Sequence, residues 1–243
     1  MGFYGQFFPW ELLLKGLAII HFIRRRPDNY WFWIILFIPF GSVIYLLVEA
    51  LPDLGLVGQS FKVFPRRKRI AQLQSMIRDN PSPGNYEELG DLLMDDGKFP
   101  QAREAFDKAI AVRADTPDPF YRRGVCAIQM GDFAAALPDL ERVVTKEPDY
   151  DFQRAAGLLA HTYAQTGLKE KAEGLFRQVT TTSTLSETYL NFADLLASEQ
   201  RTGEAREWAQ KVLDKKPTMP SYLRRRERPW FRRAKEALKK LPA

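Results

Sequence analysis

Hydrophobic positions follow two different patterns along the 243-residue chain. From the start to about residue 52 they are nearly continuous, and between Tyr30 and Leu51 the only charged residue is Glu49. After residue 83 they recur at the three- and four-residue spacing of amphipathic helices, interrupted by short turns. We therefore expect an all-α protein whose N-terminal segment has a more apolar environment than the rest.

The apolar run from Tyr30 to Leu51 is 22 residues long, and about 20 apolar residues suffice for a helix to cross a bilayer core. The earlier stretch from Phe7 to Ile23 is interrupted by Glu11 and Lys15, so one span, two spans and a re-entrant second segment all stay open. A buried helix of a globular protein is the alternative, although such helices are usually shorter and keep a polar face. We predict a membrane anchor in residues 1–52, with a transmembrane helical hairpin as its main form.

Basic residues on either side of the run set the expected orientation. Three arginines, Arg24 to Arg26, precede it, and five basic residues follow it at Lys62 and from Arg66 to Arg69. The positive-inside rule places the larger cluster in the cytoplasm. We expect an integral protein of a bacterial inner membrane with the rest of the chain in the cytoplasm.

The segment HFIRRRPDNYWFWIILFIPFGSVIYLLVE, residues 21–49, resembles the N-terminal membrane hairpin of cardiolipin synthases and related phospholipase D-type proteins. The shared features are a basic turn, a Trp-rich start and a Pro-x-Gly-x-x-x-Tyr-Leu motif. The His-x-Lys catalytic motif of those enzymes is absent, because Phe22 and Ile23 follow His21, and Thr162 and Tyr163 follow His161. The resemblance implies a shared anchor without the chemistry.

Internal repetition begins after the turn-forming segment from Asn80 to Gly84. Four alanines in equivalent contexts follow one another at steps of 34, 36 and 33 residues: Ala102, Ala136, Ala172 and Ala205. With the leucine–glycine pair at Leu89 and Gly90 and the turn glycine at Gly97, this pattern resembles the tetratricopeptide repeat, whose period is 34 residues. An ordinary helical bundle with chance spacing is the alternative.

The resemblance implies a right-handed solenoid of about four helix pairs. Small side chains would lie where paired helices cross, and glycine would form the turns. We assign repeats to residues 83–116, 117–150, 153–186 and 186–219, a basic linker with an amphipathic helix to 53–82, and a basic capping helix to 220–243.

The same resemblance implies which side chains face the groove of the solenoid. These positions are Glu87, Asp91, Met94, Asp95, Tyr121, Val125, Ile128, Gln129, Arg154, His161, Gln165, Glu187, Leu190 and Asp194. Chaperone-binding members of the family clamp a carboxylate with Lys and Asn, but Glu87 and Asp91 stand at those sites here. We expect a protein partner with basic and apolar residues; a merely solvated face is the alternative.

Charge is concentrated at the C-terminus: residues 215–243 hold 11 Lys and Arg against Glu227 and Glu236, a net charge of +9. Beside a membrane anchor, such a tail indicates anionic lipid or an acidic protein face, and we expect no nucleic acid. The candidate anionic contacts are Arg66, Arg67, Lys68, Arg69, Arg224, Arg225, Arg226, Arg228, Arg232 and Arg233.

Catalytic chemistry has little support in the sequence. The single cysteine, Cys126, excludes an intramolecular disulfide, and His21 and His161 are too far apart for a usual metal motif. No nucleophile stands beside a base, and no phosphate-binding glycine loop is present. We expect no enzyme, no metal and no cofactor.

These observations predict a membrane-anchored adaptor or scaffold that binds a partner in its groove and assists assembly or localisation of a membrane-associated complex. The alternative is a lipid-associated regulator of phospholipid metabolism that acts through the anchor and the basic C-terminal helix.

Overall fold

The computed structural model describes residues 8–25, 30–38, 40–50, 56–113 and 115–241. Every secondary-structure element in these ranges is helical, which confirms the all-α prediction. Contacts divide the chain into two compact units, Met1–Ala71 and Gln72–Ala243, with the boundary inside helix α4. We describe each unit by itself.

The N-terminal unit is a small cluster of helices. Its elements are α1 (Phe8–Arg25), α2 (Tyr30–Phe37), α3 (Gly41–Tyr45), the π-helical turn η1 (Leu46–Ala50) and the first part of α4 (Leu56–Asp79). Ala18, Trp31, Ile35 and Tyr45 form its buried core. The Tyr45 hydroxyl lies 2.9 Å from Nδ1 of His21, which satisfies a polar group at the centre of this core.

The apolar run that begins at Tyr30 does not form one continuous helix. Helix α2 has 8 residues, a rise of about 12 Å against a bilayer core of about 30 Å. Phe40 then adopts a left-handed backbone with φ of 59°, and the 5 residues of α3 follow. Helix α1 is longer, at 18 residues, but it carries the Glu11–Lys15 ion pair at 3.1 Å.

Nowhere in the described residues is a helix both long enough and apolar enough to cross a membrane. The predicted transmembrane hairpin is therefore wrong, and so is the predicted location as an integral membrane protein. The physical reason is the division of the run into short helices on either side of Phe40. Phe7, Arg26, Pro39 and Leu51, which the prediction also used, lie outside the described residues.

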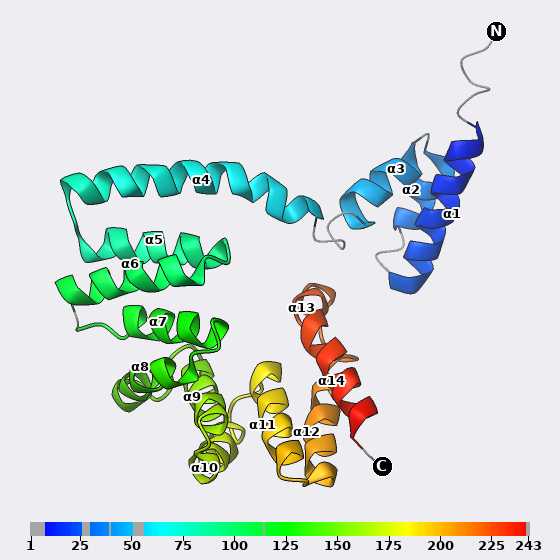
Figure 1. The fold of residues 1–243 in the computed structure, drawn as a ribbon. Helices are drawn as coiled ribbons and strands as arrows, with labels where there is room; N and C mark the ends of the chain where they lie inside the picture. The colour runs from blue at the N-terminus through cyan, green and yellow to red at the C-terminus, as the bar shows by residue number, and fades with distance from the viewer. Residues whose placement is uncertain (1–7, 26–29, 39, 51–55, 114, 242–243) are drawn as a thin grey trace. The chain divides into compact units, whose positions relative to one another are not determined.

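The second unit consists of helix pairs that follow one another in a row (Figure 1). The pairs are α5 (Pro83–Asp95) with α6 (Phe99–Val112), α7 (Asp118–Gln129) with α8 (Phe133–Lys146), α9 (Arg154–Gln165) with α10 (Lys169–Val179), and α11 (Ser186–Ser198) with α12 (Thr202–Asp214). Contacts are dense inside each pair and continue from each pair to the next. This confirms a solenoid with four repeated helix pairs in the described chain.

Small residues lie where the helices of a pair cross. The four alanines that set the repeat period, Ala102, Ala136, Ala172 and Ala205, are all fully buried. At Gly90, a Cβ atom would lie 2.6 Å from the ring of Phe106 on the partner helix. The short side chains therefore let paired helices approach closely, as the repeat pattern predicts.

The turns inside the pairs follow one backbone pattern. Gly97, Gly131 and Gly167 have φ between 72° and 84° in the first three pairs, and Gln200 occupies the equivalent place in the fourth with φ of 63°. These four residues are spaced by 34, 36 and 33 positions, like the alanines. Glycine adopts positive φ without steric cost, whereas glutamine does not.

The 36-residue step coincides with an unusual joint between α8 and α9. Asp151, Phe152 and Gln153 all have positive φ, from 50° to 65°. The Gln153 side chain has two partners: its nitrogen donates to Asp149 at 2.9 Å, and its oxygen accepts from Thr182, in the segment after α10, at 2.7 Å. The joint thus has a defined conformation despite its left-handed backbone.

Two further helices, α13 (Ser221–Arg226) and α14 (Arg228–Lys240), end the second unit. Helix α14 packs on α11 and α12. Phe231 and Ala234 of α14 join Leu190 and Val212 in a buried cluster. The last apolar face of the solenoid is therefore covered, as a capping helix requires.

Candidate partner-binding groove

The predicted groove positions all lie on the first helices of the four pairs. Helix α5 carries Glu87, Asp91, Met94 and Asp95; α7 carries Tyr121, Val125, Ile128 and Gln129; α9 carries Arg154, His161 and Gln165; α11 carries Glu187, Leu190 and Asp194. The structure brings most of these side chains into three adjoining regions, which we call the acidic end, the tyrosine pocket and the central hollow.

The acidic end is formed by Glu87, Asp91 and Asp95 of α5 and Asp118 of α7. Burial raises the pKa of Glu87, and the negative charge of Asp118 adds to the effect. Burial also raises the pKa of Asp91 above its usual value, Asp95 and Asp118 raise it further, and Arg122 opposes them. Oδ1 of Asp91 is shielded from solvent and accepts no hydrogen bond, although Nε of Arg122 lies 3.5 Å away. Negative charge is therefore incompletely compensated here.

The tyrosine pocket has a volume of about 290 Å³ and is lined by Tyr121, Arg122, Tyr150, Asp151 and Arg154. The Tyr121 hydroxyl donates to Asp151 at 2.7 Å and accepts from Arg154 at 3.4 Å. Nε of Arg154 donates to Glu187 at 2.7 Å. This network connects α7, the left-handed joint, α9 and α11, so it fixes the polar groups of three repeats relative to one another.

The central hollow has a volume of about 200 Å³ and brings together side chains from α7, α9, α11 and α14. Its lining residues are Val125, Ile128, Gln129, Arg154, Leu158, His161, Glu187, Asn191, Trp230 and Arg233. Both volumes are below the roughly 300–1,000 Å³ of small-molecule sites. Their size suits individual side chains of a bound polypeptide.

His161 is a half-buried part of the hollow wall. Its ring lies 5.5 Å from that of Phe133 in an edge-to-face arrangement. Burial lowers the pKa of His161, and the positive charge of Arg233 lowers it further. The imidazole is therefore neutral at pH 7 and adds no charge to the hollow.

Four predicted positions lie outside the acidic end, the tyrosine pocket and the central hollow: Met94, Gln165, Leu190 and Asp194. Met94 packs partly against the core, Leu190 is fully buried in the cluster under α14, and Gln165 is exposed at the end of α9. Asp194 forms an ion pair with Arg233. Leu190 and Asp194 are placed by α14, a helix that the repeat pattern alone does not describe.

The structure adds residues that the sequence analysis missed. Leu158 and Asn191 are on the repeat helices but fall between the assumed groove positions, whereas Trp230 comes from α14, outside the repeats. A strongly amphipathic C-terminal helix with one Trp was the available indication, since such a residue rarely stays on an exposed face.

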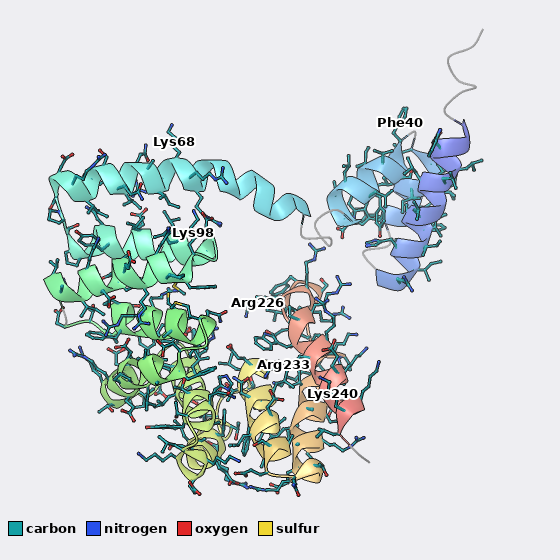
Figure 2. The ribbon with its side chains drawn as sticks, in the orientation of Figure 1. Phe40, Lys68, Lys98, Arg226, Arg233 and Lys240 are labelled. Atoms are coloured by element: carbon teal, nitrogen blue, oxygen red, sulfur yellow. The ribbon has the colours of Figure 1, made fainter. Side chains whose placement is uncertain are left out.

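The candidate anionic contacts are divided between the two units. Arg66, Arg67, Lys68 and Arg69 lie on α4. Arg224, Arg225, Arg226, Arg228 and Arg232 are exposed on α13 and α14. Arg233 instead points to α11 (Figure 2), where it donates to Asn191 at 3.0 Å and pairs with Asp194.

The remaining groups to consider for chemistry are the single cysteine and the possible metal ligands. Cys126 is fully buried, and burial raises the pKa of its thiol to about 12, so it is un-ionised at pH 7. Across the described ranges, no three His, Cys, Asp or Glu side chains are grouped so that they could hold a metal ion.

Comparison with known proteins agrees with the fold. Residues 87–129 and 127–182 match family models described as "Tetratricopeptide repeat". A 100-residue stretch is 34% identical to DnaJ homolog subfamily C member 3 of Bos taurus and covers 41% of this chain. It spans only 19% of the length of that relative. The chain therefore contains tetratricopeptide repeats, as predicted.

Solved structures show the same architecture. YrrB, described as "a TPR protein with an unusual peptide-binding site", aligns with a TM-score of 0.56 at 20% identity, over 74% of this chain and 92% of its own. MamA from Desulfovibrio magneticus RS-1 aligns with a TM-score of 0.59 at 20% identity, over 71% and 97%. The two family matches lie within residues 87–182, so they give no support to the resemblance of the N-terminal segment to the membrane hairpin of cardiolipin synthases.

Proposed function

We propose that this chain, with its tetratricopeptide repeats, is a non-enzymatic scaffold that binds a segment of a partner protein in the groove formed by α5, α7, α9 and α11. The observation that carries the proposal is the central hollow, where side chains from successive repeats converge on one space of side-chain size. YrrB, a protein of similar fold, is described as having a peptide-binding site.

The charge of the groove favours a basic residue in the partner. At the acidic end, Glu87 and Asp91 have raised pKa values because they are partly buried close to other carboxylates. A lysine or arginine of the partner would relieve this repulsion, whereas a carboxylate would increase it. Farther along the groove, the lining of the central hollow includes the apolar side chains of Val125, Ile128 and Leu158.

Peptide binding to the purified full-length chain tests the proposal. The probe is a library of nine-residue fluorescent peptides with two lysines at one end and a single leucine, phenylalanine or alanine at varied positions. Matched peptides in which glutamates replace the lysines report the charge preference. We expect the lysine peptides to bind and the glutamate peptides to bind at least about tenfold more weakly, a difference of about 1.4 kcal/mol.

Asp91→Lys should remove this preference, because it reverses the charge at the acidic end. Glu104→Lys is the matched control, since it makes the same charge change at an exposed position of α6. Equal effects of the two variants would show that the groove is not the binding surface. Failure of the unmodified chain to bind any peptide would count against the scaffold proposal for this class of partner.

We also propose that the exposed basic side chains of α13 and α14, Arg224, Arg225, Arg226, Arg228 and Arg232, contact an anionic surface. Each basic residue near anionic lipid contributes about 1 kcal/mol. Co-sedimentation with phosphatidylglycerol vesicles should therefore weaken as salt is increased and after Arg224→Gln and Arg225→Gln. Binding that does not depend on salt would contradict the proposal.

A further inference from the structure

Helix α14 does more than cover the end of the solenoid. Its Phe231 and Ala234 are buried in the cluster with Leu190 and Val212. Its Trp230 and Arg233, in contrast, line the central hollow opposite side chains of α7 and α9. One helix therefore contributes both to the core and to the groove.

Arg233, one helical turn after Trp230 on α14, holds the Trp230 side chain in place. The Arg233 guanidinium lies 5.8 Å from the Trp230 ring and donates to Asn191 at 3.0 Å. It also pairs with Asp194. These contacts connect α14 to α11, so the indole has a defined position in the wall of the hollow.

The charged side chains that line the central hollow favour an uncharged occupant. The two guanidiniums, Arg154 and Arg233, disfavour a cation, and both already have carboxylate partners in Glu187 and Asp194. An anion would therefore have to compete with these ion pairs. His161 carries no charge at pH 7, because burial and Arg233 lower its pKa.

Besides the charged groups and His161, the lining consists of two side-chain amides, Gln129 and Asn191, and four apolar side chains. Val125, Ile128 and Leu158 face the same space as the Trp230 indole. The volume of about 200 Å³ is close to that of an apolar cavity of about 150 Å³ known to hold benzene. One large apolar side chain fits this space.

We propose that α14 forms a wall of the groove, and that Trp230 with Val125, Ile128 and Leu158 makes a pocket for one aliphatic or aromatic side chain of the partner. The proposal rests on the scaffold function above and specifies its partner further. The bound segment carries a basic residue for the acidic end and an apolar anchor for the pocket. Because the acidic end attracts the basic residue, the groove favours this segment over a segment that is purely apolar.

The test combines changes in the protein with changes in the peptide. For the unmodified chain, replacement of the leucine of the best-binding lysine peptide by alanine should weaken binding about tenfold. In Trp230→Ala this ratio should fall to less than twofold, because the wall of the pocket is missing. Tyr222→Ala is the matched control, since Tyr222 is 71% exposed on α13, and it should keep the tenfold ratio.

A second variant protects the test against a folding defect in Trp230→Ala. Gln129→Trp leaves α14 unchanged and fills the hollow from an exposed position of α7. It should also reduce the leucine-to-alanine ratio to less than twofold. Far-UV circular dichroism of each variant establishes that it is folded.

The outcomes separate this inference from the scaffold proposal. If Gln129→Trp and folded Trp230→Ala still bind the leucine peptide about tenfold more tightly than the alanine peptide, the pocket proposal is wrong. This holds even if Asp91→Lys still abolishes the lysine preference. No difference between leucine and alanine peptides in the unmodified chain overturns it as well. If no library peptide binds the unmodified chain, both proposals fail.

Discussion

Individual residues in the proposed groove have local arrangements that lower the stability of the free protein. Asp91 is the clearest case, because its Oδ1 is shielded from water without a hydrogen-bond donor while other carboxylates lie nearby. Residues of this kind are expected at binding sites, where function and stability compete.

Asp91→Asn should therefore stabilise the free protein at pH 7. Since the pKa of Asp91 is raised in the folded state, its stabilising contribution is complete below the unfolded pKa and is lost as the pH rises through the folded pKa. Because the side chain is 48% exposed, we expect a gain of only a few tenths of a kcal/mol, as for exposed charge pairs. Urea unfolding at pH 7 and at pH 3 measures it.

The difference between Asp91→Asn and the unmodified chain should vanish at pH 3, where the aspartate is protonated. Glu104→Gln removes a charge from an exposed site on α6 and should leave stability unchanged at both pH values. A loss of stability in Asp91→Asn at pH 7 would mean that the pairing with Arg122 outweighs the repulsion.

Gly90 shows how a single missing methyl group sets the distance between α5 and α6. Its Cβ would lie 2.6 Å from the Phe106 ring, which is itself buried and cannot move freely. Gly90→Ala should lower the free energy of unfolding by about 1–3 kcal/mol, the usual effect of overpacking. Gly84→Ala, which meets no atom within 4 Å, should be neutral or slightly stabilising.

At the scale of the elements, each pair is a helix, a left-handed turn residue and a second helix. The fourth pair departs from the others because Gln200 takes the positive φ that glycine takes in the first three. Gln200→Gly should therefore stabilise the chain by about 0.5–1 kcal/mol, as measured by urea unfolding. Glu207→Gly, on the exposed face of α12, should have the opposite sign, about 1 kcal/mol of destabilisation.

The repeats could be predicted from the sequence because their determinants are local. Ala102, Ala136, Ala172 and Ala205 recur in register, and each is buried where its pair closes. The helix break near Phe40 was not part of the main prediction, although a re-entrant second segment was left open. Hydropathy describes how apolar a segment is and not whether its backbone stays helical. The role of Trp230 was also missed, because contact between α14 and the groove depends on residues far apart in sequence.

At the scale of the whole molecule, each apolar face of a solenoid depends on the neighbour that covers it. Removal of residues 220–243 would expose Leu190, Val212 and Tyr189 of the last pair. Exposure of three large side chains costs on the order of 5 kcal/mol, which is comparable to the total stability of a small domain. We expect hydrogen exchange to accelerate in α11 and α12 of the truncated chain and to stay slow in α7 and α8.

Uniform acceleration across all pairs would instead show that the repeats unfold as one cooperative unit. Unchanged exchange in α11 and α12 would show that α14 contributes little to their stability. Exchange rates in α11 and α12 are compared with those in α7 and α8 of the same sample. The result therefore does not depend on the overall concentration of folded protein.

The joint at Asp151, Phe152 and Gln153 has a consequence for the chirality of the chain. Each of these residues has a backbone conformation that disfavours an L-amino acid by about 1–2 kcal/mol and favours its mirror image. The joint is thus a place in the repeats where a D-amino acid would fit the backbone better than the natural residue. Phe152 is the position of choice, because its side chain is 88% exposed and inversion at Cα would disturb little of the core.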